Sequence, residues 1–442
     1  MKRLPLTYRA EDDIILMHAG EAVTRSHFVG LCQKLARQLP EEPSVINLCE
    51  DRLAFSVTFF ATLMAGGTNL LPANRVPATI DQLLSRQPQA IIISDGDNRG
   101  MYVSAVTIDT VLGLAVNSPD LPRIPANQLA AVVYTSGSTG PSSEIKKTWR
   151  TLHDSSRINM TEYGPDRLTH CLATVPSQHM WGLETTVLAP LFAPLVLASE
   201  QPLLVADIVA GLQRLPSPGA LISTPVHLRA LIEAGVPLPR LDRIYSATAP
   251  LTTTMAQRLE QLTGAVVIDV YGCSEAGCLA KRATAHEDHW QLFKAFKLER
   301  VGTAHLVSAP HLPAPVALMD FLNTTDRHRF ELVGRQDDLI NIAGKRASMA
   351  NLTQILLDIP GVIDGVIFQP PANDGGKTTR LAALVVAPEL TASELRKRLG
   401  NRIDPAFMPR PLRLVDSLPR SGSGKLPERD LLSMYTRVCD GA

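Results

Sequence analysis

Short apolar runs alternate with amphipathic stretches through the first three quarters of the chain. The runs are β-like and lie at residues 44–48, 90–94, 130–134, 220–223, 243–246 and 265–270. Between them, apolar residues recur at the three- and four-residue spacing of a helix, as at residues 27–38, 55–65 and 254–262. Alternation of this kind predicts an α/β fold of several layers, with largely parallel strands.

The pattern changes after Gly334. Charged and small polar residues cluster over 335–346, and a helix-like segment (352–357), two strand-like segments (365–368 and 382–387) and a second helix-like segment (393–399) follow. A chain of 442 residues is also too long for one compact core. We therefore expect a large N-terminal α/β domain over residues 1–335 and a small, mobile α+β domain over residues 336–442.

Composition and charge narrow the class of ligand. Apolar residues make up 45% of the chain and aromatic residues 5%, which is ordinary for an α/β protein. Lys plus Arg and Asp plus Glu both number 43, so net charge does not favour a nucleic-acid partner or an anionic membrane surface. An anionic ligand would have to be held by local groups.

Targeting and membrane signals are weak. The first residues lack a continuous apolar segment, and the longest apolar run, 187–198, contains two prolines and is too short for a bilayer. We expect a cytoplasmic protein without a membrane span. The six cysteines are scattered, and the spacing of Cys273 and Cys278 makes a poor zinc site, so we expect reduced thiols.

A loop rich in hydroxyl groups and glycines follows the apolar strand at residues 129–134. Glycines let the backbone approach a polyphosphate closely, and hydroxyls add hydrogen-bond donors. The loop is not a Walker A motif, because no Gly-Lys-Ser/Thr follows at the required distance. An exposed Ser/Gly turn is the alternative. The residues concerned are Thr135, Ser136, Gly137, Ser138, Thr139 and Gly140.

Residues 134–140 resemble the phosphate loop Tyr-Thr-Ser-Gly-Ser/Thr-Thr-Gly-x-Pro-Lys of the adenylate-forming superfamily. That superfamily comprises acyl- and aryl-CoA synthetases, nonribosomal-peptide adenylation domains and firefly luciferases. The resemblance implies that residues 135–140 bind the phosphates of ATP. The Pro-Lys step departs from the family pattern, because Pro141 follows Gly140 directly, and Lys146 or Lys147 would have to replace the family's lysine.

Two further segments resemble the family's adenine-binding motifs. Residues 243–251 are similar to Ser-Gly-Gly-Ala-Pro-Leu, with Ala247 and Thr248 in place of the glycines, which implies a tighter wall between adenine and acyl pocket. A purely structural strand and turn is the alternative. Residues 269–275, Asp-Val-Tyr-Gly-Cys-Ser-Glu, are similar to Tyr-Gly-x-Thr-Glu.

The side chains of this second motif suit nucleotide binding. Tyr271 offers a flat face to adenine, and Asp269 can accept a hydrogen bond from its exocyclic amine. Glu275 is a hard oxygen ligand for a Mg²⁺ ion that also binds ATP phosphates. The resemblance also places Gly272 and Ser274 against the nucleotide and Cys273 against the acyl pocket.

Later motifs complete the family resemblance. Arg335 lies in a segment similar to Gly-Arg-x-Asp-Asp-x-Ile-Lys, and the family's ribose-binding aspartate precedes that arginine by fifteen residues, which selects Asp320 over its competitor Asp326. Asp337 matches the hinge of the C-terminal domain. Gly344 matches the family's thiol channel.

Lys425 is the best candidate for the catalytic lysine. Residues 418–429 resemble the family's Pro-x-Thr-x-x-Gly-Lys-x-x-x-Arg, and a lone cation on a glycine-rich loop can bridge the carboxylate and the α-phosphate as charge develops. Without the other motifs, this segment would be read as a flexible basic tail.

The substrate class follows from residues 176–182, which resemble Pro-Leu-Phe-His-x-x-Gly of acyl- and aryl-CoA ligases. By this match His179 borders the acyl pocket and contributes to catalysis, and Trp181 forms a pocket wall. The aspartate that amino-acid-activating domains use to pair the α-ammonium is missing from this segment, which favours an aryl or medium-chain acid over an amino acid. Ligases of aryl-polyene-type pathways resemble this chain in the same segment.

The resemblance therefore implies an ATP- and Mg²⁺-dependent ligase. It would form an acyl-adenylate and pass the acyl group to CoA or to the phosphopantetheine of an acyl carrier protein. A non-catalytic acyl-AMP- or nucleotide-binding protein, an amino-acid adenylation enzyme and a luciferase-type oxidase are the alternatives. The residues Glu275, Arg335 and Lys425 argue against the non-catalytic protein.

Overall fold

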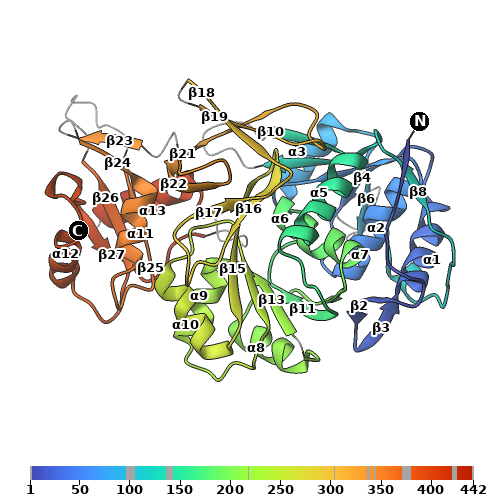
Figure 1. Ribbon diagram of the computed structural model, residues 1–442, viewed down its shortest axis with the longest axis horizontal. Helices are drawn as coiled ribbons and strands as arrows, with labels where there is room; N and C mark the ends of the chain where they lie inside the picture. The colour runs from blue at the N-terminus through green and yellow to red at the C-terminus, as the bar shows by residue number, and fades with distance from the viewer. Residues whose placement is uncertain are drawn as a thin grey trace.

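A long sheet with a parallel centre runs through the N-terminal part of the protein, as the computed structural model in Figure 1 shows. The structure describes residues 2–95, 105–135, 143–217, 219–302, 304–335, 339–342, 345–370, 380–420 and 426–440. In spatial order the strands are β21 (Asp320–Thr324), β22 (Arg329–Arg335), β17 (Trp290–Leu292), β16 (Gly277–Arg282), β15 (Val266–Cys273), β14 (Arg243–Ser246), β13 (Gly219–Ser223), β11 (Thr169–Ala173), β12 (Leu195–Ala198), β2 (Ile14–His18) and β3 (Glu21–Thr24).

The centre of this sheet is parallel and its flanks are antiparallel. Strands β15, β14, β13, β11, β12 and β2 run parallel to one another. Strands β16, β17, β22 and β21 add on in antiparallel fashion at one end, and β3 pairs antiparallel with β2 at the other. Parallel strands need crossover connections, and three of those in this sheet are each made by a single helix. These are α8 (Val205–Arg214), α9 (Pro225–Glu233) and α10 (Thr253–Thr263).

A second sheet lies in the first third of the chain. Its strands are, in spatial order, β10 (Ser143–Thr148), β9 (Leu129–Thr135), β5 (Thr68–Leu71), β4 (Ser44–Asn47), β6 (Ile91–Ser94) and β7 (Ala105–Thr107). The largest core cluster packs here around helices α1 and α2, with α2 almost wholly buried. The helices of this part are α1 (Arg25–Ala36), α2 (Arg52–Met64), α3 (Pro77–Arg86), α4 (Asp109–Leu112) and α5 (Trp149–Glu162).

Smaller elements fill the remainder of the N-terminal part. A π-helical turn, η1 (Leu183–Leu188), lies between two short helices, α6 (Met180–Gly182) and α7 (Ala189–Phe192). Strands β1 (Arg3–Pro5) and β8 (Arg123–Pro125) pair with each other, and a separate sheet contains β18 (Lys297–Val301), β19 (Ala304–Ser308) and β20 (Val316–Leu318).

The C-terminal part has its own hydrophobic cores, drawn from residues after position 339. Figure 1 shows it, in orange and red, at one end of the molecule. Its elements are β23 (Leu339–Ile342), β24 (Lys345–Ser348), α11 (Met349–Leu357), β25 (Asp364–Phe368), β26 (Ala382–Val386), α12 (Ala392–Gly400), η3 (Pro405–Phe407), β27 (Leu412–Leu414) and α13 (Glu428–Asp440). The domain boundary expected at residue 335 stays a prediction, because residues 336–338 lie outside the described ranges.

The expected strands and helices of the sequence pattern coincide with observed elements to within a few residues. The apolar run 187–198 is almost wholly buried, but it is not one element, because it ends η1, forms α7 and then enters β12. Among the described residues, we find no helix with the length and apolar character that crossing a membrane would require. The pattern of apolar residues did not predict the antiparallel strands β16–β22, because short turns interrupt the alternation of apolar and polar residues there.

Arg52 lies fully buried at the start of α2 and connects this helix to the end of β11 in the large sheet. Its guanidinium donates to the carbonyl groups of Ala173 at 2.7 Å and Val175 at 2.9 Å, and to Ser177 Oγ at 3.2 Å. These acceptors lie at and beyond the end of β11, in the segment that leads to His179. Arg52 therefore supplies hydrogen-bond donors to buried backbone carbonyls at the end of β11 and just beyond it.

We expect Arg52→Met to lower the free energy of unfolding by about 3 kcal/mol, because it leaves those buried carbonyls without a donor. Urea denaturation followed by circular dichroism measures the change. The matched control is Arg37→Met, which removes an exposed arginine after α1 and should leave stability near that of the wild type. Equal stability of the two variants would contradict this role of Arg52.

Candidate active site

The carboxyl ends of four parallel strands meet at one edge of the large sheet. The register pairs Ala173 with Ile222, Ser223 with Ser246, and Ser246 with Asp269. The segments that leave β11, β14 and β15 at this edge contain three of the predicted motifs, at residues 176–182, 247–251 and 271–275. Ligands of open α/β sheets bind outside the carboxyl ends of the strands, so this edge is the candidate site.

The residues predicted to bind the nucleoside lie together. The hydroxyl of Tyr271 donates to Asp320 Oδ2 at 2.7 Å. Asp320 begins β21 and pairs directly with Arg335 at the end of β22, so the backbone fixes the spacing between these two. Of Arg335, only the backbone is described. The structure thus brings Tyr271, Asp320 and the Arg335 backbone to one place.

Asp326, the competing ribose ligand, has a different role. It lies in the exposed turn between β21 and β22, where its Oδ1 accepts from the backbone N–H groups of His328 at 2.7 Å and Arg329 at 2.8 Å. These backbone hydrogen bonds lower the pKa of Asp326. Its carboxylate shapes the turn, which leaves Asp320 as the candidate for the ribose.

Asp269, which the sequence predicts to accept a hydrogen bond from adenine, lies in a buried network of polar side chains. It is 1% exposed, and its carboxylate contacts Arg282 at 3.4 Å. Burial raises its pKa to about 7, although Arg282 and Thr284 oppose that rise. Arg282 in turn lies over the Trp290 ring at 4.6 Å. Asp269 therefore interacts with Arg282 in the interior, and its contact with adenine stays a prediction from the sequence.

The acyl side of the site is built from an aromatic cluster. His179 is half-buried and immediately precedes α6, and Trp181 is buried with its ring centroid 6.5 Å from that of Tyr163. Tyr163 also lies 5.8 Å from Tyr245 and from Phe293. These rings fill the space behind Trp181.

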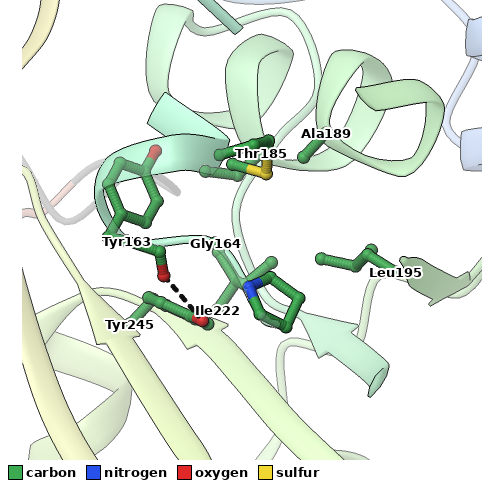
Figure 2. A pocket seen from close by; sticks show the side chains of 9 residues that line it. Tyr163, Gly164, Thr185, Ala189, Leu195, Ile222 and Tyr245 are labelled. Carbon is green, nitrogen blue, oxygen red and sulfur yellow. Dashed lines mark hydrogen bonds between the residues drawn. The ribbon is translucent and has the colours of Figure 1, made fainter. Parts of the chain in front are cut away.

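A small apolar pocket lies next to this cluster. Figure 2 shows Tyr163 and Tyr245 on one side of it, with the Tyr245 hydroxyl donating to the Tyr163 carbonyl at 3.1 Å. The other lining residues are Met160, Gly164, Pro165, Thr185, Ala189, Leu195 and Ile222. The lining thus offers few polar groups to a ligand.

Two residues of the predicted motifs have unusual backbone requirements. A Cβ at Gly182 would collide with the carbonyl of Pro176, so the turn that carries His179 can close only with glycine at this position. Thr248 has φ +78°, a conformation that a β-branched residue rarely adopts. Its side chain is exposed at the sheet edge, and Ala247 beside it is buried. Strain of this kind clusters at ligand sites.

Glu275 lies at the tip of the hairpin between β15 and β16 with its side chain exposed, and Ser274 is half-buried beside it. Gly272 and Cys273 end β15, where burial raises the pKa of Cys273 to about 12 and leaves the thiol protonated. The described residues contain no group of three His, Cys, Asp or Glu side chains that could hold a metal alone. A Mg²⁺ ion would take Glu275 and oxygen atoms of the ATP phosphates, which is how Mg²⁺ is usually bound.

The two lysines considered for the phosphate loop differ in placement. Lys146 is exposed on β10, whereas Lys147 is buried and its Nζ donates to the carbonyl of Glu275 at 2.6 Å. Lys147 therefore points into the protein, and the expectation that it replaces the family's phosphate-binding lysine is not supported. The only sequence signal for this difference is the alternation of faces along β10.

Several predicted residues lie outside the described parts of the chain. Only the backbone of Thr135 is described, at the end of β9. Roles for these residues stay predictions from sequence. The residues outside the described ranges are Ser136, Gly137, Ser138, Thr139, Gly140, Asp337, Gly344 and Lys425.

Known proteins with similar sequences include CoA ligases and a carrier-protein ligase. 4-Coumarate–CoA ligase of Halorhodospira halophila is 27% identical over 301 residues, which cover 66% of this chain and 73% of that protein. 3,4-Dihydroxybenzoate–[aryl-carrier protein] ligase of Bacillus anthracis is 20% identical over 322 residues, covering 70% of this chain and 74% of that protein.

The fold is also that of a solved adenylate-forming enzyme. ATP-bound MatB from Rhodopseudomonas palustris superposes with a TM-score of 0.81 over 97% of both chains, at 19% identity. Residues 7–304, more than half of the chain, match the model of the family described as AMP-binding enzyme. The chain therefore belongs to the AMP-binding enzyme family, and it is an AMP-forming acid–thiol ligase that uses ATP with Mg²⁺.

Proposed function

We propose that this ligase activates a compact aryl or medium-chain carboxylic acid and transfers the acyl group to CoA or to a carrier-protein phosphopantetheine. The observation that carries the proposal is the meeting of three segments at one sheet edge. The Tyr271–Asp320 pair can hold the nucleoside, Glu275 lies at the hairpin tip, and the His179 segment borders an aromatic wall.

The character of the acyl side supports the choice of acid. The rings of Tyr163, Tyr245 and Phe293 fill the space behind Trp181, which favours a flat or short acid over a long chain. The segment from Pro176 to Gly182 contains no carboxylate to pair with an α-ammonium, so an amino acid would bury an unpaired charge there. The ligases of aryl acids among the similar proteins agree with this choice.

The reaction follows in two steps. A carboxylate oxygen of the acid attacks the α-phosphorus of ATP, forming the acyl–phosphate bond as the bond to pyrophosphate breaks. Lys425 would stabilise the charge that develops there, and Mg²⁺ bound through Glu275 would neutralise the departing phosphates. The thiol, having lost its proton, then attacks the acyl carbonyl carbon, and AMP leaves as the thioester forms.

Pyrophosphate release with a panel of aryl and medium-chain acids tests the first step. We expect release with at least one aryl acid, and Glu275→Ala should reduce it by about 100-fold because a metal ligand is lost. ATP binding without release for every acid would favour the non-catalytic nucleotide-binding protein. Competition between CoA and a phosphopantetheine-loaded carrier protein then identifies the acceptor.

The two half-reactions should respond differently to the loss of Lys425. We expect Lys425→Ala to slow adenylate formation by at least about 100-fold, because the cation on the α-phosphate is missing. Thioester formation from supplied acyl-adenylate should change by no more than about threefold, since the lysine acts only in the first step. Rapid-quench measurement of each half-reaction checks this, and equal losses in both would contradict the assignment.

Thr248→Gly should increase stability and broaden substrate choice. Glycine adopts φ +78° without strain, so we expect the free energy of unfolding to rise by about 1 kcal/mol, measured by urea denaturation. Removing the side chain from the pocket wall should raise the ratio of kcat/KM for bulky over small acids by about tenfold. Thr248→Ser, which keeps a Cβ, is the matched control and should show neither change. An unaltered acid preference in the glycine variant would place Thr248 outside the acyl pocket.

A further inference from the structure

Lys147 has a buried ammonium group that holds the backbone of the Glu275 hairpin. Its side chain is 2% exposed, and its Nζ donates to the carbonyl of Glu275 at 2.6 Å. Burial lowers the pKa of Lys147, and the negative charge of Glu184 opposes that shift. A buried charge is costly unless it is paired and hydrogen-bonded, so this position requires a compensating anion.

Glu184 supplies that anion and holds the opposite strand of the same hairpin. It is 1% exposed on η1, and its Oε2 accepts from the backbone N–H of Cys278 at 3.2 Å and from Cys278 Sγ at 3.1 Å. Its Oε1 accepts from Ser155 Oγ at 2.5 Å and Asn159 Nδ2 at 3.2 Å, both on α5. The carboxylate thereby joins the hairpin to the helix beneath it.

Gly277 permits this close approach. It pairs with Cys273 across the hairpin and has φ +81°. A Cβ at this position would lie 2.7 Å from Glu184 Oε1 and 3.1 Å from Ser155 Oγ. The hairpin can therefore approach the buried carboxylate only with glycine here.

The hairpin has few side chains that could anchor it by packing. Between its strands lie Ser274, Glu275 and Ala276, and only Ala276 is buried. Its position depends instead on backbone contacts, with a cation on the carbonyl of Glu275 and an anion on the N–H of Cys278. The two contacts bracket the exposed carboxylate of Glu275.

We propose that Lys147 and Glu184 are positioning residues that fix the backbone on both sides of Glu275 and so preset its carboxylate for Mg²⁺. The inference rests on the proposed function, in which Glu275 is the Mg²⁺ ligand. Both residues would act on Glu275 through the backbone of the hairpin. Groups that orient a metal ligand commonly affect metal affinity as strongly as a ligand does.

Calorimetric binding of α,β-methylene-ATP, with excess Mg²⁺ and with EDTA, tests this proposal on the full-length chain. The ratio of the two Kd values gives the gain in affinity due to Mg²⁺. We expect Lys147→Met to reduce that gain by about tenfold and to change the Kd in EDTA by less than about twofold. A loss of equal size in Mg²⁺ and in EDTA would overturn the proposal.

A thermodynamic cycle with Glu275→Ala shows whether Lys147 acts through Glu275. In the Glu275→Ala background, Lys147→Met should cause no further loss of the Mg²⁺-dependent gain, because the carboxylate that it positions is absent. A full additive loss would overturn the proposal. Arg150→Met, at an exposed position on α5, is the control that removes a nearby cation and should leave the gain unchanged.

The double variant Lys147→Met/Glu184→Gln distinguishes an effect on folding stability from an effect on the position of Glu275. It removes both buried charges, so it should unfold at a higher Tm than Lys147→Met alone, yet the Mg²⁺-dependent gain should stay low because the Glu275 carbonyl still lacks its donor. Recovery of the gain in this variant would overturn the proposal. The binding assay requires no acid, so failure of pyrophosphate release with every acid would contradict the proposed function without affecting this result.

Discussion

The parallel register of β13, β14 and β15 is the constraint on which the rest of the site depends. Because Ser223 pairs with Ser246 and Ser246 with Asp269, the chain leaves each strand at the same edge. Residues far apart in sequence, such as Thr248 and Glu275, therefore follow strands that end at the same edge of the sheet. The side chains beyond the strand ends can differ from those of other family members without disturbing that placement.

The antiparallel strands that follow place the residues predicted to bind the nucleoside. The hairpin of β21 and β22 pairs Asp320 with Arg335, and Tyr271 contacts Asp320 across the sheet. Asp326, which has the same chemistry, is used at the turn instead. The two carboxylates thus differ in their place in the hairpin, with Asp320 at a strand end and Asp326 within the turn.

Much of the fold was predictable from sequence because the parallel strands are buried on both faces and appear as continuous apolar runs. The antiparallel strands from β16 to β22 were missed, since short strands with mixed exposure lack that signal. In the site, the motifs predicted which residues share the sheet edge. They did not reveal that Arg282 pairs with Asp269, whose contact with adenine stays a prediction. Glu184 ends the Gln-His-x-x-Gly-Leu-Glu segment, but its contact with the β15–β16 hairpin was not predicted.

The buried charges of Lys147 and Glu184 hold the hairpin in a way that apolar packing could not. A metal ligand at a hairpin tip has to remain exposed, so the residues around it must be small or polar and offer little apolar surface to bury. Backbone polar groups then anchor the loop together with the buried Ala276, and contacts from charged side chains hold them more strongly than neutral ones would. Taking both charges out of water costs free energy, and their mutual attraction together with the four hydrogen bonds at Glu184 offsets that cost. The same reasoning explains why glycine is needed at position 277, since the anchor works only if the backbone can approach the carboxylate directly.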